Sequence, residues 1–156
     1  KYKNIWHHGD YIQRTKNGGF IIHGRSDSTL NPGGVRIGTA EIYRQVEKIN
    51  FIRESLVVGK TIDNDTKIIL FVVLNIKKKL KKEDVDFLKK EIRKNCSPKH
   101  VPFKIIQTPE IPRTKNGKIV ELAVKKAIHG EKIENLQSLS NPDSMNFYKK
   151  FFKDGF

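Results

Sequence analysis

KIILFVVLN, at residues 67–75, is an apolar stretch rich in the β-branched residues that favour strands. Residues 55–59, SLVVG, have the same character. The polar residues Asp63, Asn64 and Asp65 separate the two stretches. A polar turn between two such runs predicts a pair of strands.

Further elements are predicted on both sides of this pair. Apolar spacing predicts helices at 39–49, 83–95, 118–129 and 145–152, and a third strand at Lys104–Gln107. Thr39 is the expected N-cap of the first helix, and Gly130 is the expected stop of the third. The order helix, strand, strand, helix, strand, helix predicts an α+β domain after residue 38, with a three-stranded sheet flanked by helices.

The first 26 residues predict a separate pair of strands, one ending at 6–10 and one at 20–23. Asn17-Gly18 lies between them, and Asn-Gly is a hairpin signal because both turn positions need positive φ. A charged, glycine-rich connector follows at 24–38, GRSDSTLNPGGVRIG, where the apolar pattern stops. We expect a domain boundary in this connector.

The chain is basic, with 31 Lys and Arg against 17 Asp and Glu and a formal net charge of +14. Residues 77–104 hold eleven of the basic and four of the acidic residues, about half of that excess. Apolar residues recur there at steps of three and four, at Val85, Leu88, Ile92 and Cys96, so the lysines suit the solvated back of an amphipathic helix. A phosphate-bearing partner on the same face is the second interpretation.

Composition excludes several classes of protein. No apolar stretch approaches the ~20 residues of a transmembrane helix. The single cysteine, Cys96, excludes an internal disulfide framework and a cysteine-rich zinc site, and it fits a reducing, cytoplasmic compartment. With 156 residues, 37% of them hydrophobic, the chain suits a small core. Because it begins Lys1-Tyr2-Lys3 without Met, we expect a piece of a longer polypeptide.

The segment Trp6-His7-His8-Gly9-Asp10 is the first that could carry chemistry. Adjacent residues on a strand point to opposite faces, so the two histidines are not expected to share a metal ion. A carboxylate that follows glycine at a strand end can accept hydrogen bonds from a ribose diol. The alternative is an ordinary turn aspartate.

The second segment joins Gly24-Arg25-Ser26-Asp27 to Gly33-Gly34-Val35-Arg36-Ile37-Gly38. Glycines let a backbone approach a ligand closely, and arginines bind anions. Composition alone favours a binding loop and an ordinary hairpin equally.

The third segment is Pro112-Arg113-Thr114-Lys115-Asn116-Gly117-Lys118-Ile119. It places Lys118 in the first turn of the predicted helix, where a positive charge opposes the helix dipole. A local rule broken beside glycine and proline suggests a function, whereas the plain alternative is a solvated lysine.

Together the three segments resemble the adenylate-forming superfamily of acyl-CoA synthetases, luciferases and peptide-synthetase adenylation domains. Its last core motifs are matched in order by Gly9-Asp10, Gly24-Arg25-x-Asp27, Gly34-x-Arg36-Ile37 with Glu41, and Pro112 to Gly117-Lys118. NPGGVRIGTAEIYRQVEKI, SPKHVPFKI, PRTKNGKIVELAVKKAIHG and the tail NPDSMNFYKKFF are most similar to ligases that join acetoacetate to CoA. Ser28 departs from the second aspartate that many relatives carry after the hinge.

The resemblance implies a reaction in two halves. Acetoacetate attacks the α-phosphate of ATP to give an acyl-adenylate and pyrophosphate, and the CoA thiol then displaces AMP. It implies that residues 1–26 end a large N-terminal domain and that 27–156 form a mobile C-terminal domain with its hinge at Asp27. The ATP triphosphate site, its Mg²⁺ and the acyl pocket would belong to the large domain, so the 156 residues alone are expected to be inactive.

The resemblance also implies residue roles. Asp10 would hold the ribose of ATP, Arg25 would grip the same nucleotide, and Lys118 would bridge the carboxylate and the α-phosphate. The backbone at Gly33 and Gly34 would line the pantetheine tunnel. Two more expected contacts are Arg36 with a phosphate and the basic face at 89–104 with the nucleotide phosphates of CoA.

Lys118 is also an expected target of a protein acetyltransferase, because acetylation would remove its charge. An acetyl- or propionyl-CoA synthetase is the nearest alternative. A basic nucleic-acid-binding module is the alternative from another class, although Phe87 and Phe103 are the only aromatic residues in the 77–104 run.

Overall fold

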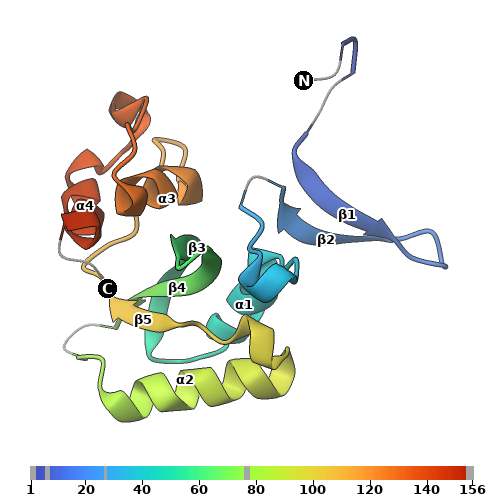
Figure 1. Ribbon diagram of the computed structural model, residues 1–156, viewed down its shortest axis with the longest axis horizontal. Helices are drawn as coiled ribbons and strands as arrows, with labels where there is room; N and C mark the ends of the chain where they lie inside the picture. The colour runs from blue at the N-terminus through green and yellow to red at the C-terminus, as the bar shows by residue number, and fades with distance from the viewer. Residues whose placement is uncertain (1–2, 6–7, 27, 76–77, 154–156) are drawn as a thin grey trace.

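The computed structural model describes residues 3–5, 8–26, 28–75 and 78–153. In these described ranges, five strands form two separate sheets: β1 (Asp10–Arg14) with β2 (Phe20–Arg25), and β3 (Ile52–Ile62) with β4 (Asp65–Leu74) and β5 (Lys104–Gln107). The same ranges contain four helices: α1 (Thr39–Val46), α2 (Lys82–Asn95), α3 (Glu121–His129) and α4 (Met145–Lys153). Short 3₁₀ turns lie at η1 (Pro32–Gly34), η2 (Pro98–His100), η3 (Leu136–Ser138) and η4 (Pro142–Ser144). The β1–β2 ribbon projects from the rest of the molecule (Figure 1).

The three-stranded sheet has the order β3-β4-β5, with β4 antiparallel to β3 and parallel to β5. The predicted pair of strands and the third strand are confirmed. Both long strands extend beyond the apolar runs, because the backbone ladder continues through polar pairs as far as Ile62 opposite Asp65. The turn is therefore only Asp63-Asn64, and both residues have positive φ, 49° and 57°.

Both faces of this sheet are covered, which explains the unbroken apolar run in β4. Alternate residues of β4 point to opposite faces, as strand geometry requires. Ile68, Leu70, Val72 and Leu74 belong to one core cluster, which also contains residues of α1 and α2. Ile69, Phe71 and Val73 belong to the other, which contains residues of α3 and α4. Figure 1 shows α2 on one side of the sheet and α3 and α4 on the other, so the α+β prediction is confirmed.

Two predicted helix starts are wrong. Gly38, not Thr39, is the N-cap of α1, and no side chain caps the helix. Thr39 is already the first residue of the helix, and it is buried. The third helix begins at Glu121 and not at Lys118, because Ile119 pairs with Arg113 in an antiparallel bridge that keeps this stretch extended. Gly130 ends this helix in the left-handed conformation, as predicted.

The N-terminal hairpin is present, but its turn is not the predicted one. Strand β1 begins at Asp10 and does not end there, while Trp6 and His7 lie outside the described residues. Residues 15–19 form the loop, and Gly18 has positive φ whereas Asn17 does not. Thr15 closes the loop by donating its N–H to the Gly19 carbonyl and accepting from the Gly18 N–H, so a two-residue turn is not needed.

Candidate functional site

Asp10 and Arg25 lie opposite each other at one end of the β1–β2 ribbon, because the strand register pairs them. His8 Nδ1 donates to Asp10 Oδ2 at 2.6 Å. The N–H and the hydroxyl of Ser26 both donate to the Gly9 carbonyl, at 2.7 and 3.0 Å, which fixes this end of the ribbon. The structure thus brings together the predicted ribose acceptor and the predicted nucleotide arginine. The predicted hinge residue, Asp27, lies outside the described residues.

The glycine loop, defined here as residues 31–36, is closed at its base by two backbone hydrogen bonds of 2.9 Å between Leu30 and Ile37. Both of these residues are buried in the domain core. At the tip, Gly33 and Gly34 have φ of 55° and 79°, which is why glycine is needed there. A Cβ on Gly34 would meet no atom within 4 Å, so the backbone is open at this residue.

Arg36 lies on the exposed side of the glycine loop and contacts the ribbon. Its Nη1 donates to Tyr11 Oη at 3.3 Å, and its guanidinium carbon lies 5.7 Å from the centre of the Tyr11 ring. Arg44 of α1 likewise donates to the carbonyl of Ile22. These contacts join the ribbon to the α+β domain across residue 27.

The lysine loop, defined here as residues 113–118, presents Lys118 to solvent. The Thr114 N–H donates to the Lys118 carbonyl at 2.8 Å, and the Lys118 N–H donates to Thr114 Oγ1 at 3.1 Å. Gly117 has φ of 78°. Because α3 begins only at Glu121, Lys118 does not lie in a helical first turn, and the predicted conflict with the helix dipole is wrong. The first turn carries an acidic residue instead, Glu121, which the dipole favours.

Arg113 anchors the lysine loop to the sheet, a role that the sequence did not reveal. Its Nη1 donates to the Gly117 carbonyl at 2.7 Å. Its Nη2 and Nε donate to Glu54 Oε2 on β3, at 2.8 and 3.2 Å. One side chain therefore fixes both the shape of the loop and its position on the domain.

The two loops are attached at opposite ends of the β3–β4 hairpin. Glu54, which holds the lysine loop, lies near the start of β3. Asp65, which accepts a hydrogen bond of 2.7 Å from the Gly33 N–H, lies beside the turn that follows Ile62. At about 3.3 Å per residue, the strand between Glu54 and Ile62 is roughly 26 Å long.

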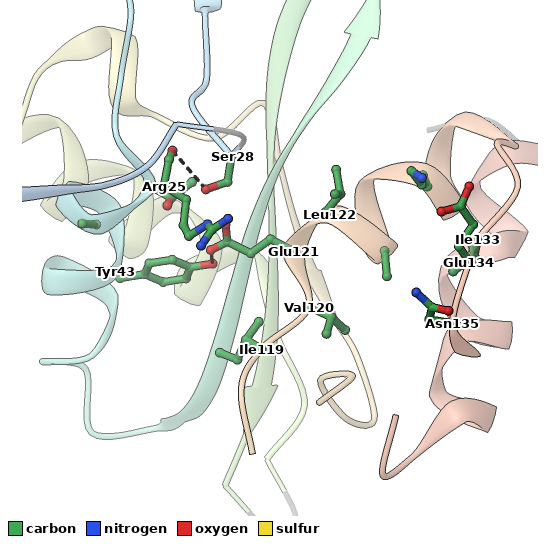
Figure 2. A pocket seen from close by; sticks show the side chains of 14 residues that line it. Arg25, Ser28, Tyr43, Ile119, Val120, Glu121, Leu122, Ile133, Glu134 and Asn135 are labelled. Carbon is green, nitrogen blue, oxygen red and sulfur yellow. Dashed lines mark hydrogen bonds between the residues drawn. The ribbon is translucent and has the colours of Figure 1, made fainter. Parts of the chain in front are cut away.

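A cleft of about 560 Å³ lies between α1 and α3, and Figure 2 shows the side chains that line it. Arg25 and Ser28 line it from the ribbon side, and Ile119 and Glu121 line it from the end of the lysine loop. Tyr43 spans it: its hydroxyl donates to Glu121 Oε1 at 2.5 Å and accepts from the Val57 N–H at 3.0 Å. Burial, with Glu121 alongside, holds the pKa of Tyr43 well above its usual value, so this phenol remains a donor.

Glu41, a motif residue to which the sequence gave no role, joins two histidines from different parts of the chain. His100 Nε2 donates to Glu41 Oε2 at 2.6 Å, and His23 Nδ1 lies 3.8 Å from Glu41 Oε1. The Ser97 hydroxyl lies 2.8 Å from His100 Nδ1. Glu41 therefore ties β2 and η2 to the start of α1.

The amphipathic face predicted for 83–95 is confirmed: Leu88 and Ile92 are buried and Val85 packs against the same core. Cys96 is half-buried at the end of the helix. Phe87 and Phe103 are each nearly half exposed. Among the described residues, no group of three His, Cys, Asp or Glu could hold a metal ion, and no helix is long and apolar enough to cross a membrane.

Known proteins resemble this arrangement closely. The acetoacetyl-coenzyme A synthetase of Rhizobium meliloti (strain 1021) is 48% identical over 148 residues, 95% of the chain. The structure of acetoacetyl-CoA synthetase from Streptomyces lividans superposes with a TM-score of 0.85 and 42% identity over 96% of the chain. The chain is similar to acetoacetyl-CoA synthetases over nearly its whole length. It spans only 23% of the length of each of these two acetoacetyl-CoA synthetases.

The wider superfamily is also represented. A benzoate CoA ligase from Burkholderia xenovorans LB400 matches with a TM-score of 0.66 and 26% identity, over 75% of the chain and 23% of its own. No protein-family model matches the chain. The similarity to acetoacetyl-CoA synthetases therefore rests on whole-chain comparison with individual proteins.

Proposed function

We propose that this chain is the C-terminal part of an ATP-dependent acid–CoA ligase that makes acetoacetyl-CoA through an acyl-adenylate. Residues 1–26 end its large domain, and 27–156 form a mobile domain that turns about Asp27. The similarity to acetoacetyl-CoA synthetases over 95% of the chain supports this proposal.

The observation that carries the proposal is the placement of the two loops. The lysine loop and the glycine loop are held at opposite ends of one rigid hairpin, separated by roughly 26 Å of strand. A domain that holds the two loops at separate ends can present them one at a time by turning between the two half-reactions, with Lys118 serving the first and Gly33-Gly34 serving the second.

The exposed apolar surface of the ribbon supports the domain boundary. Ile12, Phe20 and Ile22 are each about 60% exposed. A two-stranded ribbon cannot bury such side chains by itself, and a cluster of them marks a surface that packs on something else. The large domain of the same polypeptide is the occupant that the proposal implies.

In the first half-reaction, charge builds on the α-phosphate as the carboxylate of acetoacetate attacks it. Lys118 supplies a cation there, while Asp10 holds the ribose hydroxyls and Arg25 grips the same nucleotide. Mg²⁺ enters with ATP on the large domain. In the second half-reaction, the backbone at Gly33 and Gly34 lines the path of the pantetheine arm.

Two further cations serve the substrates in this proposal. Arg36 meets a phosphate in one of the two poses, since the ribbon contact seen here has to break when the domain turns. The exposed basic residues at 89–104 attract the nucleotide phosphates of CoA. The same face keeps the nucleic-acid alternative open to test, because that function requires duplex binding that weakens steeply as salt rises.

Regulation and location extend the same proposal. Lys118 is exposed on a tight loop, which suits modification by a protein acetyltransferase, and acetylation would remove the charge needed for adenylation. The lone thiol of Cys96 suits a cytoplasmic location.

An acid panel on the full-length polypeptide tests the substrate. Pyrophosphate release with ATP is expected to be at least tenfold faster with acetoacetate than with acetate or propionate at equal concentration. Faster release with acetate or propionate would replace the proposed substrate with that acid. Absence of release with every acid, together with salt-sensitive duplex binding, would favour the nucleic-acid alternative.

Arg113→Ala is expected to slow adenylation in the full-length polypeptide 10- to 100-fold. Arg113 holds the lysine loop through charged hydrogen bonds, and losing such a bond costs about 1.5–3 kcal/mol. Adenylation is measured by pyrophosphate release and thioester formation by adding CoA to pre-made acetoacetyl-adenylate, which should proceed at the normal rate.

Arg53→Ala is the matched control for this change. Arg53 also approaches Glu54, through Nε at 3.4 Å, but within the described part of the chain it makes no hydrogen bond or ion pair with the lysine loop. It should leave both half-reactions within about twofold of the unmodified rates. If Arg53→Ala slowed adenylation as much as Arg113→Ala, the anchoring role of Arg113 would be wrong.

A further inference from the structure

Asp65 is the one side chain outside the glycine loop whose carboxylate accepts a hydrogen bond from the tip of that loop, among the contacts of the described residues. Its Oδ1 accepts from the Gly33 N–H at 2.7 Å and from the Thr66 N–H at 2.8 Å. Its Oδ2 accepts from Lys67 Nζ at 2.9 Å. The carboxylate thus links the loop tip to the first residues of β4.

The loop needs this link because its other supports lie at its base. Leu30 and Ile37 fix the ends of the loop, while Gly33 and Gly34 at the tip have no side chains to pack. Gly34 has open space around it. Of the tip's two glycine N–H groups, only that of Gly33 has a bond to a side chain among the described residues, so Asp65 sets where the tip stands above the sheet.

A second charged group lies against the tip. A Cβ on Gly33 would come within 2.5 Å of Lys99 Nζ on η2, so the lysine end group occupies the space beside this glycine. Lys99 therefore lies on the Gly33 side of the Gly33–Asp65 contact, and Lys67 lies on the Asp65 side, where it is paired with the carboxylate. Its removal would free the tip and leave Lys67 without this partner.

We propose that Asp65 is a positioning residue for thioester formation: it holds the tip of the glycine loop where the backbone of Gly33 and Gly34 can line the path of the pantetheine arm. This inference rests on the proposed function of the glycine loop in the second half-reaction. Asp65 itself does not touch CoA; it acts through the Gly33 N–H.

The Asp65 carboxyl is ionised at neutral pH, so it can accept these hydrogen bonds. The Gly33 N–H, followed by Lys67, lowers the pKa of Asp65 to about 2 from the usual 3.8. A carboxyl whose folded pKa is depressed stabilises the fold above its unfolded pKa, and that contribution is lost as pH falls from about 4 toward 2. Asp65 therefore holds the loop equally well throughout the neutral pH range. The pH profile of thioester formation near neutrality should have the same shape with Asp65→Asn as without it.

The test compares Asp65→Ala and Asp65→Asn in the full-length polypeptide, with the two half-reactions measured separately. Asp65→Ala is expected to lower kcat for thioester formation from pre-made acetoacetyl-adenylate and CoA 10- to 100-fold, and to leave pyrophosphate release within twofold. Asp65→Asn keeps an amide oxygen that can accept from the Gly33 N–H, so it should recover thioester formation to within about fivefold of normal. Asp63→Asn removes a charge from the adjoining turn, at a position whose positive φ asparagine tolerates as well as aspartate, and it should change neither rate.

Three results would overturn the inference: equal loss of both half-reactions with Asp65→Ala, no loss of thioester formation, or an Asp65→Asn variant as slow as Asp65→Ala. If Asp65→Ala fails to fold in a thermal unfolding assay, Asp65→Asn is compared with Asp63→Asn instead. A loss of thioester formation greater than fivefold in Asp65→Asn then counts against the positioning role of Asp65. Gly34→Leu separates this inference from the proposed function. If Gly34→Leu spares thioester formation, the function of the loop is wrong; if it blocks that step while Asp65→Ala does not, only the role of Asp65 is wrong.

Discussion

Lys118→Ala in the full-length polypeptide is expected to slow adenylate formation from acetoacetate and ATP about a thousandfold. The charge on the α-phosphate grows as the carboxylate attacks, so a cation placed there stabilises the transition state more than the bound substrates. One unit charge at ~4 Å in an effective dielectric near 20 is worth roughly 4 kcal/mol. That energy corresponds to about three decades of rate.

Thioester formation from pre-made acetoacetyl-adenylate should survive the same change, because in the proposed mechanism the domain has by then carried Lys118 away from the reacting carbon. Pyrophosphate release measures the first half and CoA consumption with added adenylate measures the second. Lys115→Ala is the matched control: it removes another exposed lysine of the same loop, whose backbone N–H to the Ser138 carbonyl does not need the side chain. It should leave both rates within about twofold.

Lys118→Arg examines placement as well as charge. Arginine keeps the cation but spreads it over a wider, planar group, so it should restore only part of the lost rate. If Lys118→Ala left adenylation at its normal rate, the assignment of this lysine would fail, and with it the first half of the proposed function.

The sheet could be predicted from the sequence because its signals are local. The run at 67–75 is apolar at every central position, and Lys104–Gln107 is a short apolar strand with clear ends. Gly130 also marks a helix end by a purely local requirement, its left-handed conformation. These features are set by residues only a few positions apart, so a single sequence is enough to predict them.

Helix starts and turns were harder, since distant partners decide them. The third helix is predicted to begin at Lys118, but the bridge between Arg113 and Ile119 keeps this stretch out of the helix, which begins at Glu121. Thr39 has the chemistry of an N-cap, yet Gly38 takes that place because it packs against the carbonyl of His23, where any Cβ would clash. In both cases a contact with a residue distant in sequence overrides the local preference for a helix start.

In the candidate site, too, locally determined features were predicted and those set by distant partners were not. The motifs pointed to the loops that carry Lys118 and Gly34, but not to the side chains that hold those loops. Glu54 lies 59 residues before Arg113, and Gly33 lies 32 residues before Asp65. Residues so far apart have no spacing rule that would link them, and Asp65 looked like an ordinary turn residue. The anchors became visible only once the β3–β4 hairpin had placed them.

Gly34→Leu is expected to slow thioester formation at least a hundredfold and to leave adenylation within about twofold. Gly34 stands at the open tip of the glycine loop, so a leucine side chain there would project into the path proposed for the pantetheine arm. The surrounding structure has room for the side chain, because a Cβ at this position meets no atom within 4 Å. The two half-reactions are measured as for Lys118→Ala.

Strain of the backbone is the competing explanation, since leucine disfavours positive φ by roughly 1–2 kcal/mol. Gly18 and Gly117 provide matched controls: their φ values are 81° and 78° against 79° for Gly34, and a Cβ on either also meets no atom within 4 Å. Gly18→Leu carries the same strain in the ribbon turn and should leave both half-reactions unchanged. Gly117→Leu carries it beside Lys118 and should slow adenylation while sparing thioester formation. If Gly34→Leu slows only thioester formation and Gly117→Leu slows only adenylation, each loop serves one half-reaction. Equal loss of both steps in either variant would contradict this assignment of separate half-reactions to the two ends of the β3–β4 hairpin.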